Sequence, residues 1–500
     1  MPQKKNRTDA VFSALLPNCR VPTGYTALKY GLLLAVFIYI LSYLLIPFSN
    51  EDPAYYTVLG RGIIRYHLFP YSYGFDHKPF GVDLFYGLWD QITPFYRGKF
   101  TLLAFVLIGL ITCICHAFGE FSRRTAFILL IVCGSMFDIL SGNSELVLLT
   151  GEALCLTLML KGLENNQNSL FFLAGCVAAF VVNVNYLSAL CLLAPAAVLL
   201  LSPGWFRLSR CGLTLLGSMT GLMLLFSPYI MAGHGALQTY FSMQQNFLHH
   251  YSGSWHERLR GLLWNTIDLV LLSPILLAWC RRFSPLDWTE ENRKNLLLPL
   301  WFLSSLPATI LSGHPFDHYF QLCFVPAAIM WAILLRQGAA STGYMLIPFF
   351  ASVAFFMVQN THKNYNTLRF SNRVNYAAIH KEIGQKKVLN IRTHESVFYM
   401  ADLKPFDIYL FYTHIDIMYG QQAWQHYLQD LQQNAPYVVM PYDACARHQV
   451  EVPVCQWIQA HYQLIYAINV RPSRPNKFSL SIYKLVQPAQ PQTNSEMQAH

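Results

Sequence analysis

Long apolar segments, separated by short polar stretches, follow one another from residue 30 to residue 359. The first of them is roughly 19 residues long, which is enough to cross the ~30 Å hydrocarbon core of a bilayer as a helix. The pattern predicts an α-helical polytopic membrane protein with about eleven transmembrane helices. The segments fall at 30–48, 100–118, 125–140, 146–160, 170–184, 186–201, 213–232, 262–280, 296–312, 319–335 and 344–359.

The stretch 169–201 is ambiguous, because Asn183-Val184-Asn185-Tyr186 interrupts one apolar run. It forms either one long tilted helix or two short helices. With two helices, the basic clusters from the N-terminus to Arg336 all lie on one side, and the short loops on the other side contain no Lys or Arg. Because basic loops stay in the cytoplasm, this pattern favours two helices and places the N-terminus in the cytoplasm.

An odd number of spans leaves three larger pieces outside, namely the first loop (49–99), the loop 233–261 and the tail from about residue 360. The tail alternates strand-like runs with helical stretches, which predicts a small α/β domain over residues 360–486. Residues 487–500 are rich in Gln, Pro and Ser, and we expect them to form a disordered end.

Two cysteines, Cys445 and Cys455, lie in this outer tail, and an oxidising compartment permits a disulfide between them. The alternative is a pair of reduced, partly buried thiols. Most of the other cysteines lie inside apolar runs, where a thiol behaves as a small hydrophobe. The sequence contains no CxxC pair and no His/Cys spacing typical of a metal site.

The composition agrees with a membrane protein that carries some soluble mass. Of the 500 residues, 54% are hydrophobic and 12% are charged, whereas about 25% are charged in a soluble chain. The net charge of +9 comes from basic residues scattered over short loops, which indicates topology signals rather than a nucleic-acid surface. The first apolar segment lacks a small-residue cleavage site, so we expect a retained helix.

The first loop carries the most informative polar residues. Glu51 and Asp52 follow the first apolar segment at once, and Tyr56 comes four residues after Asp52. Acidic residues held against a bilayer are costly, so their default interpretation is functional. Asp52 is either the N-cap of a helix with Pro53 at the first helical position, or a general base that activates an acceptor hydroxyl or amine. The two roles do not exclude each other.

Three cationic residues of the same loop are candidates for binding an anionic group. Lys78 lies in the turn Asp76-His77-Lys78-Pro79, and its ammonium is a compact point charge suited to a phosphate. The alternative is an interfacial lysine near lipid headgroups. Arg61 and Arg65 lie four residues apart on one face of a predicted helix, where they either hold an anion or remain solvated.

Two further polar turns open predicted spans from the outside. In Asn143-Ser144-Glu145, the glutamate either orients a substrate or caps the following helix. The segment from Gly313 to Tyr319 holds two histidines and an aspartate, but such a local cluster is weak evidence for a metal, and contacts to a phosphate or sugar are favoured. The aromatic and amide residues of loop 233–261 suit sugar stacking and equally suit a membrane interface.

Together these pieces resemble the GT-C glycosyltransferases, in particular the branch that contains the protein O-mannosyltransferases and the lipid A aminoarabinose transferases. The acidic first-loop motif with Tyr at +4 is present as Asp52 and Tyr56, and a later Tyr…Lys-Pro element as Tyr71 with Asp76-His77-Lys78-Pro79. An Asn-Ser/Thr-Glu turn is present as Asn143-Ser144-Glu145.

A Gly-x-x-x-x-His-Tyr entry to a span matches Gly313 with His318-Tyr319. The chain departs from the family pattern at two places: the usual Asp-Glu pair reads Glu51-Asp52, and Phe80 stands where a second Pro follows Lys-Pro. The Tyr at +4 favours Asp52 as the catalytic carboxylate.

The resemblance implies a transmembrane GT-C module over residues 1–359 and a C-terminal α/β periplasmic domain. It implies transfer of a hexose or pentose from a polyprenyl-phosphate-linked donor to a glycan, lipid or protein acceptor, at the outer face of a bacterial inner membrane. Positive charge stabilises the leaving lipid phosphate, so neither a metal nor a cofactor is expected. The implied catalytic residues are Asp52 and Glu51, and the implied substrate-binding residues are Tyr56, Arg61, Arg65, Tyr71, His77, Lys78, Asn143, Glu145, His318 and Tyr319.

Two alternatives share the membrane location. A transporter or flippase of lipid-linked saccharides is expected to show repeated halves with broken helices, and the sequence shows no internal repeat. A polymerase or ligase of such saccharides centres on a large late external loop with arginines, whereas here the acidic loop comes first.

Overall fold

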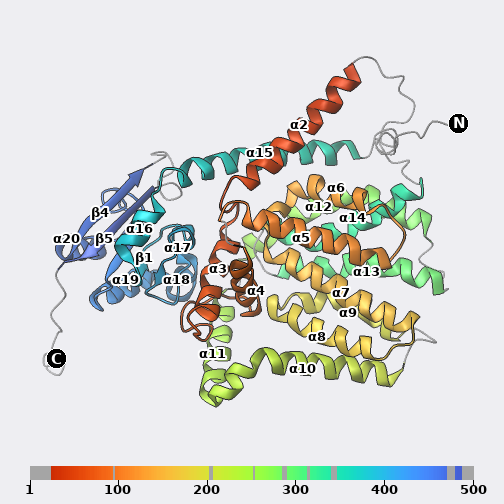
Figure 1. Ribbon diagram of the computed structural model, residues 1–500, viewed down its shortest axis with the longest axis horizontal. Coiled ribbons are helices and arrows are strands. Elements are labelled where there is room, and N and C mark those ends of the chain that lie inside the picture. Colours follow the sequence, from red (N-terminus) through yellow and green to blue (C-terminus); the bar gives the residue numbers. More distant parts are fainter. Residues whose placement is uncertain are drawn as a thin grey trace.

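The computed structural model describes residues 24–93, 96–201, 207–251, 254–283, 290–311, 316–338, 346–469 and 479–486. A bundle of helices forms most of the molecule, and a β-sheet with its own helices follows it in the chain (Figure 1). Each predicted apolar segment contains a helix. These helices are α2 (Gly24–Leu44), α5 (Lys99–Ile114), α6 (Arg123–Cys133), α7 (Ser144–Glu164), α8 (Ser169–Val184), α9 (Ser188–Leu201), α10 (Leu208–Ala232), α12 (Trp255–Arg282), α13 (Glu290–Leu311), α14 (Gln321–Arg336) and α15 (Ile347–Ser371).

The expected count of about eleven spans is not confirmed. Within the described residues, six helices are long and apolar enough to cross a membrane, namely those that include α5, α7, α10, α12, α13 and α14. Helix α6 has only 11 residues, because the chain tightens after it into the short 3₁₀ turns η2 (Gly134–Phe137) and η3 (Ile139–Ser141). The apolar stretches of α2, α8 and α9 are shorter than a full span.

The ambiguous run 169–201 is two helices, as the charge pattern predicts. Helix α8 ends at Val184 and α9 begins at Ser188. The side-chain oxygen of Asn185 accepts a hydrogen bond from the backbone N–H of Leu187 at 3.0 Å, which stabilises the turn. The polar interruption is therefore a helix break with its own hydrogen bonding.

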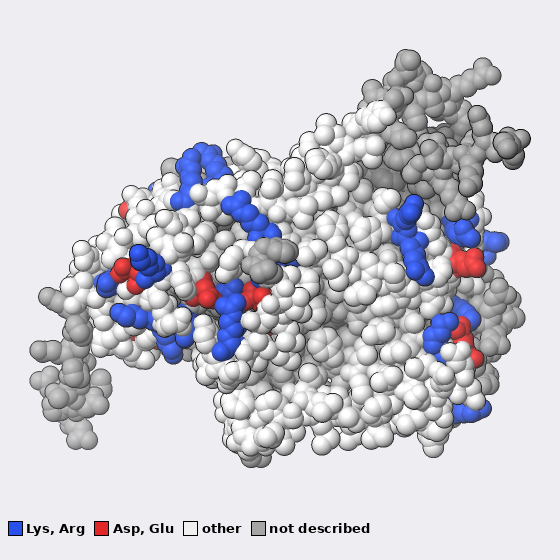
Figure 2. Space-filling model, in the orientation of Figure 1, with Lys and Arg blue, Asp and Glu red and all other residues white. Residues whose placement is uncertain are grey.

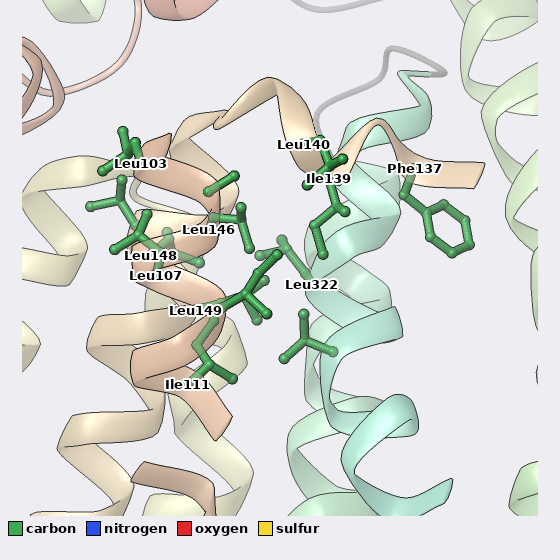
Figure 3. Close-up of a cluster of buried hydrophobic side chains, with 14 of the residues drawn as sticks. Leu103, Leu107, Ile111, Phe137, Ile139, Leu140, Leu146, Leu148, Leu149 and Leu322 are labelled. Atoms are coloured by element: carbon green, nitrogen blue, oxygen red, sulfur yellow. The ribbon is translucent and has the colours of Figure 1, made fainter. Parts of the chain in front are cut away.

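Aliphatic side chains hold the centre of the bundle together. Leu103, Leu107 and Ile111 of α5 face Leu146 and Leu149 of α7 (Figure 3). Each of these five side chains is at most 5% exposed. Burying a side chain of this size contributes about 1.5–3 kcal/mol, so the α5–α7 contact firmly positions the N-terminus of α7.

The outer surface of the bundle is apolar and largely uncharged. Leu215, Met223 and Leu224 of α10 are 63%, 63% and 68% exposed, which suits contact with lipid tails and is costly in water. Figure 2 shows Lys and Arg gathered over the sheet region and at the opposite end of the bundle, with an uncharged band between them. Together with the six apolar helices, this surface indicates a polytopic membrane protein.

The first loop folds into two helices, α3 (Glu51–Ile64) and α4 (Gly81–Ile92), which lie between the bundle and the sheet (Figure 1). They approach closely at Gly60 and Gly87, since a Cβ on Gly60 would lie 2.2 Å from the carbonyl oxygen of Asp83. Most of the loop 233–261 is also helical, as α11 (His234–His250) and the start of α12. Much of the two expected external loops is therefore helical.

The expected end of the last apolar segment at residue 359 is not the end of a helix, because α15 continues to Ser371. The polar side chains beyond it are hydrogen bonded: Asn360 Nδ2 donates to the carbonyl of Ser135 at 2.8 Å, and Asn364 Nδ2 donates to Ser42 Oγ at 3.1 Å. Past residue 359 the helix therefore contacts the bundle through polar side chains.

The C-terminal part forms a five-stranded mixed sheet in the order β2-β1-β3-β5-β4. Strands β1, β2 and β3 are parallel, whereas β5 pairs antiparallel with β3 and β4. Its elements are α16 (Tyr376–Ile383), β1 (Lys387–Asn390), α17 (Ser396–Ala401), β2 (Lys404–Pro405), α18 (Tyr412–Tyr419), α19 (Ala423–Gln432), β3 (Tyr437–Met440), α20 (Val452–His461), β4 (Tyr462–Asn469) and β5 (Ser479–Leu485). Cys445 and Cys455 form a disulfide. The expected tail 487–500 lies outside the described residues.

Candidate active site

Helix α3 begins at the site, but Asp52 does not cap it. The N-cap is Asn50, whose side-chain oxygen accepts a hydrogen bond from the backbone N–H of Asp52 at 3.3 Å. The prediction that Asp52 is the N-cap with Pro53 at the first helical position is therefore wrong, because the helix begins at Glu51. Asn is as good a cap as Asp, so the structural role falls to Asn50 and the Asp52 carboxylate faces the site.

Asp52 lies opposite His318, which enters from η4 (Asp317–Phe320). Asp52 Oδ2 is 3.8 Å from His318 Nε2, and the two side chains are 27% and 12% exposed. Burial raises the pKa of Asp52 above its ordinary value, although attraction to His318 and to Lys78 opposes the shift. A carboxylate with a raised pKa is a better proton acceptor near neutral pH, as a general base requires.

Lys78 lies at the centre of the site and is 4% exposed. Its Nζ donates to Ser144 Oγ at 2.7 Å and to Glu145 Oε1 at 3.3 Å, at the N-terminus of α7. The ammonium also faces the rings of Tyr56 and Tyr319, at 5.1 and 5.9 Å from their centroids. Burial lowers the pKa of Lys78, but the nearby carboxylates, Glu145 first among them, outweigh burial and hold that pKa above its ordinary value. Lys78 therefore carries a fixed positive charge.

Polar atoms without partners line the same place. Asn143 is fully buried, and neither its amide nitrogen nor its amide oxygen has a hydrogen-bond partner among the described residues. The second carboxylate oxygen of Glu145, Oε2, is likewise unpaired. Leaving a buried polar group unsatisfied costs about 1–3 kcal/mol, so these atoms are the expected contacts of a ligand.

The turn before α7 fixes these groups. Gly142 has φ +68°, and a Cβ there would lie 2.4 Å from the carbonyl oxygen of Phe100, so only glycine fits. The hydroxyl of Tyr86 donates to the carbonyl of Gly142, and the Tyr86 ring packs on Tyr56 at 5.4 Å. These contacts fix the position of the first loop relative to α7.

Tyr71 and His77 brace the loop that carries Lys78. Tyr71 stacks on Tyr240 of α11 with centroids 4.8 Å apart, and its hydroxyl donates to the carbonyl of Lys78 at 3.3 Å. Gln244 of α11 donates to the same carbonyl at 3.2 Å. His77 Nδ1 lies 3.0 Å from Asp76 Oδ1. These contacts set the backbone at Lys78, so Tyr71 and His77 hold the loop in place.

Arg61 and Arg65 point to a different cluster, although they lie on one face of α3 as predicted. Asp90 of α4 binds Arg61 Nε at 2.9 Å, Arg65 Nη2 at 2.7 Å and Lys99 Nζ at 2.6 Å. Asp402, which follows α17, closes the cluster against Arg61 at 3.0 Å. These guanidinium groups therefore join α3 to α4 and to the C-terminal part.

Glu51, the other predicted catalytic carboxylate, faces the C-terminal part. Its Oε1 lies 2.5 Å from His394 Nε2, and the neighbouring Glu395 is fully buried. No signal in the first 359 residues predicts this contact. His394 and Glu395 were missed because the pairing joins residues more than 300 positions apart.

Among the residues that the structure describes, three groups of side chains have the donor types and spacing of a metal site, with ligand atoms within 4.8 Å of one another. They are Asp76, His77 and His414; Glu51, His394 and Glu395; and Asp407, His426 and Asp430. Burial lowers the pKa of His414 to about 3, so that imidazole is neutral. Of the predicted span entry 313–319, Gly313, His314 and Pro315 lie outside the described residues.

The fold is that of a polytopic helical membrane protein with a C-terminal sheet, and an Asp–Lys–Glu site lies where the bundle, α3 and α7 meet. The structure is similar to that of ArnT from Cupriavidus metallidurans bound to undecaprenyl phosphate, with a TM-score of 0.55 and 12% identity over 94% of this chain and 100% of that chain. The apo form of ArnT gives a TM-score of 0.54 and 12% identity over 94% of this chain and 99% of that chain.

ArnT is a lipid A aminoarabinose transferase of the GT-C superfamily, so the expected GT-C fold is confirmed. The oligosaccharyltransferase of Archaeoglobus fulgidus tethered with an acceptor peptide is more distant, with a TM-score of 0.42 and 12% identity over 91% of this chain and 74% of that chain. No protein-family model and no curated protein matches the sequence. At 12% identity, the likeness to ArnT shows the fold alone.

Proposed function

We propose that the protein is a glycosyltransferase that moves a sugar from a polyprenyl-phosphate-linked donor to an acceptor on the outer face of a bacterial inner membrane. The observation that carries the proposal is the convergence of Asp52, Lys78, Glu145 and His318, from four separate segments, at one end of a GT-C bundle. ArnT, a solved structure with this fold, binds undecaprenyl phosphate, which supports a donor of the same lipid class.

In this proposal, Asp52 accepts the proton of the acceptor hydroxyl or amine as that atom attacks the anomeric carbon. The bond between this carbon and the phosphate oxygen breaks, and the lipid phosphate leaves with the electron pair. Lys78, whose positive charge is fixed by burial among carboxylates, stabilises the charge on the departing phosphate. His318, 3.8 Å from Asp52, orients the carboxylate.

Among the predicted cations we assign the donor phosphate to Lys78 alone, because Arg61 and Arg65 are engaged by Asp90. Asn143 and Glu145 offer unpaired polar atoms toward the same space and are proposed to bind the sugar hydroxyls. Tyr56 and Tyr319 flank Lys78 and keep water from it. Tyr71 and His77 position the loop.

The orientation follows from charge and from the disulfide. Lys and Arg lie both over the sheet region and at the opposite end of the bundle (Figure 2). Orientation depends on the short loops between apolar helices, and the basic residues of those loops support a cytoplasmic location for the end away from the sheet. The disulfide between Cys445 and Cys455 suits an oxidising, periplasmic location for the C-terminal part. We therefore propose that the site opens to the periplasm.

The decisive test is a strain that lacks this protein. We expect a polyprenyl-phosphate-linked sugar to accumulate and one glycan modification to disappear, and the wild-type chain but not Asp52→Asn to restore it. The lost modification names the acceptor. Absence of any lipid-linked sugar from the deletion strain, with all envelope glycans intact, would reject the proposal.

A further inference from the structure

Glu395 is the most unusual charged residue outside the proposed transfer site. Its side chain is fully buried, and neither carboxylate oxygen has a hydrogen-bond partner among the described residues. A buried carboxylate without a partner is strongly unfavourable, and such groups in proteins are normally paired or bound to a metal. The residue lies at the N-terminal end of α17 (Ser396–Ala401), where the C-terminal part meets α3.

Two further donors surround this carboxylate. Glu51 Oε1 and His394 Nε2 are 2.5 Å apart, and both side chains are largely shielded, at 27% and 13% exposed. The ligand atoms of Glu51, His394 and Glu395 all lie within 4.8 Å of one another. Two carboxylates at this distance repel each other unless a positive charge lies between them.

The imidazole of His394 is held in the orientation that a ligand needs. Its Nδ1 accepts a hydrogen bond from the backbone N–H of Ser396 at 3.3 Å and lies 2.6 Å from Ser396 Oγ, and the ring packs against Phe48 at 5.4 Å between centroids. These contacts fix the orientation of the ring, which is what a metal-binding histidine needs from its surroundings. Here the other nitrogen, Nε2, faces Glu51.

We propose that Glu51, His394 and Glu395 form a divalent-cation site that joins the start of α3 to the C-terminal part. One imidazole and two carboxylates are ligands typical of Zn²⁺, at bond lengths of about 2.0–2.2 Å. Ligand atoms on one Zn²⁺ are farther apart than the 2.5 Å between Glu51 and His394, so a bound cation would separate these two side chains slightly. Ca²⁺ is a poor fit, because it takes oxygen ligands only.

The position of the site gives the cation a role. Glu51 is the first residue of α3 and directly precedes Asp52, so a cation on Glu51 fixes the helix end that carries the proposed base. The other end of α3 is already tied to the same C-terminal part through Arg61 and Asp402, at 3.0 Å. Cation binding would therefore attach both ends of α3 to the C-terminal part.

Zinc content of the purified full chain tests the proposal independently of transfer activity. Protein in detergent is stripped with a chelator, supplied with a small excess of ZnCl₂, washed and analysed by elemental mass spectrometry. We expect Glu395→Gln and His394→Gln each to lose one equivalent of zinc relative to wild type, and the double variant to lose no more than either one. Glu382→Gln, which removes an exposed glutamate of α16, is the control and keeps the wild-type content.

Thermal unfolding gives a second readout. A cation that binds only the folded chain raises the unfolding midpoint by mass action, so ZnCl₂ is expected to stabilise the wild type more than Glu395→Gln, and CaCl₂ neither. Unchanged zinc content and an unchanged zinc effect in both Glu395→Gln and His394→Gln would overturn the site and leave a proton shared between these groups. The transfer proposal is untouched by that outcome, since it rests on Asp52 and Lys78.

Discussion

Both ends of α3 carry charged side chains, but these side chains differ in how completely they are paired. At the C-terminal end, Arg61 and Arg65 face Asp90, which three cations contact at 2.6–2.9 Å. At the N-terminal end, the one ion pair of Asp52 within the described residues is with His318 at 3.8 Å. The carboxylate oxygens of Glu395, which lies beside Glu51, have no hydrogen-bond partner among the same residues.

The difference separates structural charges from functional ones. A charge whose hydrogen-bonding capacity is filled by the protein stabilises a fixed geometry and has nothing left for a ligand. A buried charge with unused capacity costs stability, and proteins keep such groups mainly where a ligand or a reaction uses them. By this criterion α3 is fastened at its C-terminal end and reactive at its N-terminal end.

The largest expected effect follows from changing the reactive end. Asp52→Asn removes the proton acceptor but keeps the size of the side chain, and it leaves the Asn50 cap in place. Loss of a general base costs about 10²–10⁴-fold in rate. We expect near-zero transfer from a folded, membrane-inserted protein that still binds undecaprenyl phosphate, and a much milder defect for Glu51→Gln. Near-normal transfer by Asp52→Asn would move the search to Glu145.

The C-terminal end of α3 is tested by removing Asp90, the carboxylate that Arg61, Arg65 and Lys99 share. Asp90→Ala leaves Arg61 and Lys99 buried without a counter-charge, and breaking a buried pair costs roughly 3–5 kcal/mol. We expect a clear drop in the midpoint of thermal unfolding. Asp416→Ala, which breaks a half-exposed pair with Arg392, is the matched control and should change the midpoint little. Equal effects of the two variants would contradict the distinction.

Lys78 and Lys99 provide a matched pair of buried lysines, each bound to one carboxylate or more. Charge-assisted contacts contribute about 1.5–3 kcal/mol, so Lys78→Met is expected to weaken undecaprenyl phosphate binding about tenfold or more, measured by titration in detergent. Lys99→Met is expected to lower stability while the folded fraction binds normally. If both variants bound the lipid phosphate as the wild type does, Lys78 would not be its ligand.

The pH dependence of transfer sharpens the role of Asp52. Burial raises its pKa above the ordinary value, so the active, deprotonated form is lost at a higher pH than for an exposed aspartate, near 3.9. The rate should fall about tenfold per pH unit below that raised pKa. A rate profile that stays flat down to pH about 4 would exclude Asp52 as the base.

The smallest effect is expected at Arg65, which is 33% exposed. Partly exposed ion pairs contribute about 0–1 kcal/mol, and Asp90 keeps its two buried partners. Arg65→Ala should therefore lower the unfolding midpoint only slightly and leave undecaprenyl phosphate binding unchanged. Loss of lipid binding in this variant would return Arg65 to the donor site that its sequence position first indicated.

Local patterns determined much of the fold by themselves. Apolar segments located the helices of the bundle, because a helix in lipid satisfies its own backbone hydrogen bonds and needs only apolar side chains. They did not locate α11, which lies in the expected loop 233–261. Charge placed the break between α8 and α9 at Asn185, and alternation located β1 and β3 at Val388 and Tyr437. The sequence motifs contain Asp52, Lys78 and Glu145, which the fold brings together.

What only the tertiary structure decided is the partner of each charge. The spacing of Arg61 and Arg65 predicts one face of a helix, but Asp90 and Asp402 on other elements determine that this face is filled. An N-cap at Asp52 was an equally good local reading, yet the side chain of Asn50 takes it. The energy of a charge depends on burial and on neighbours distant in sequence, and the adjacent residues of the chain predict neither.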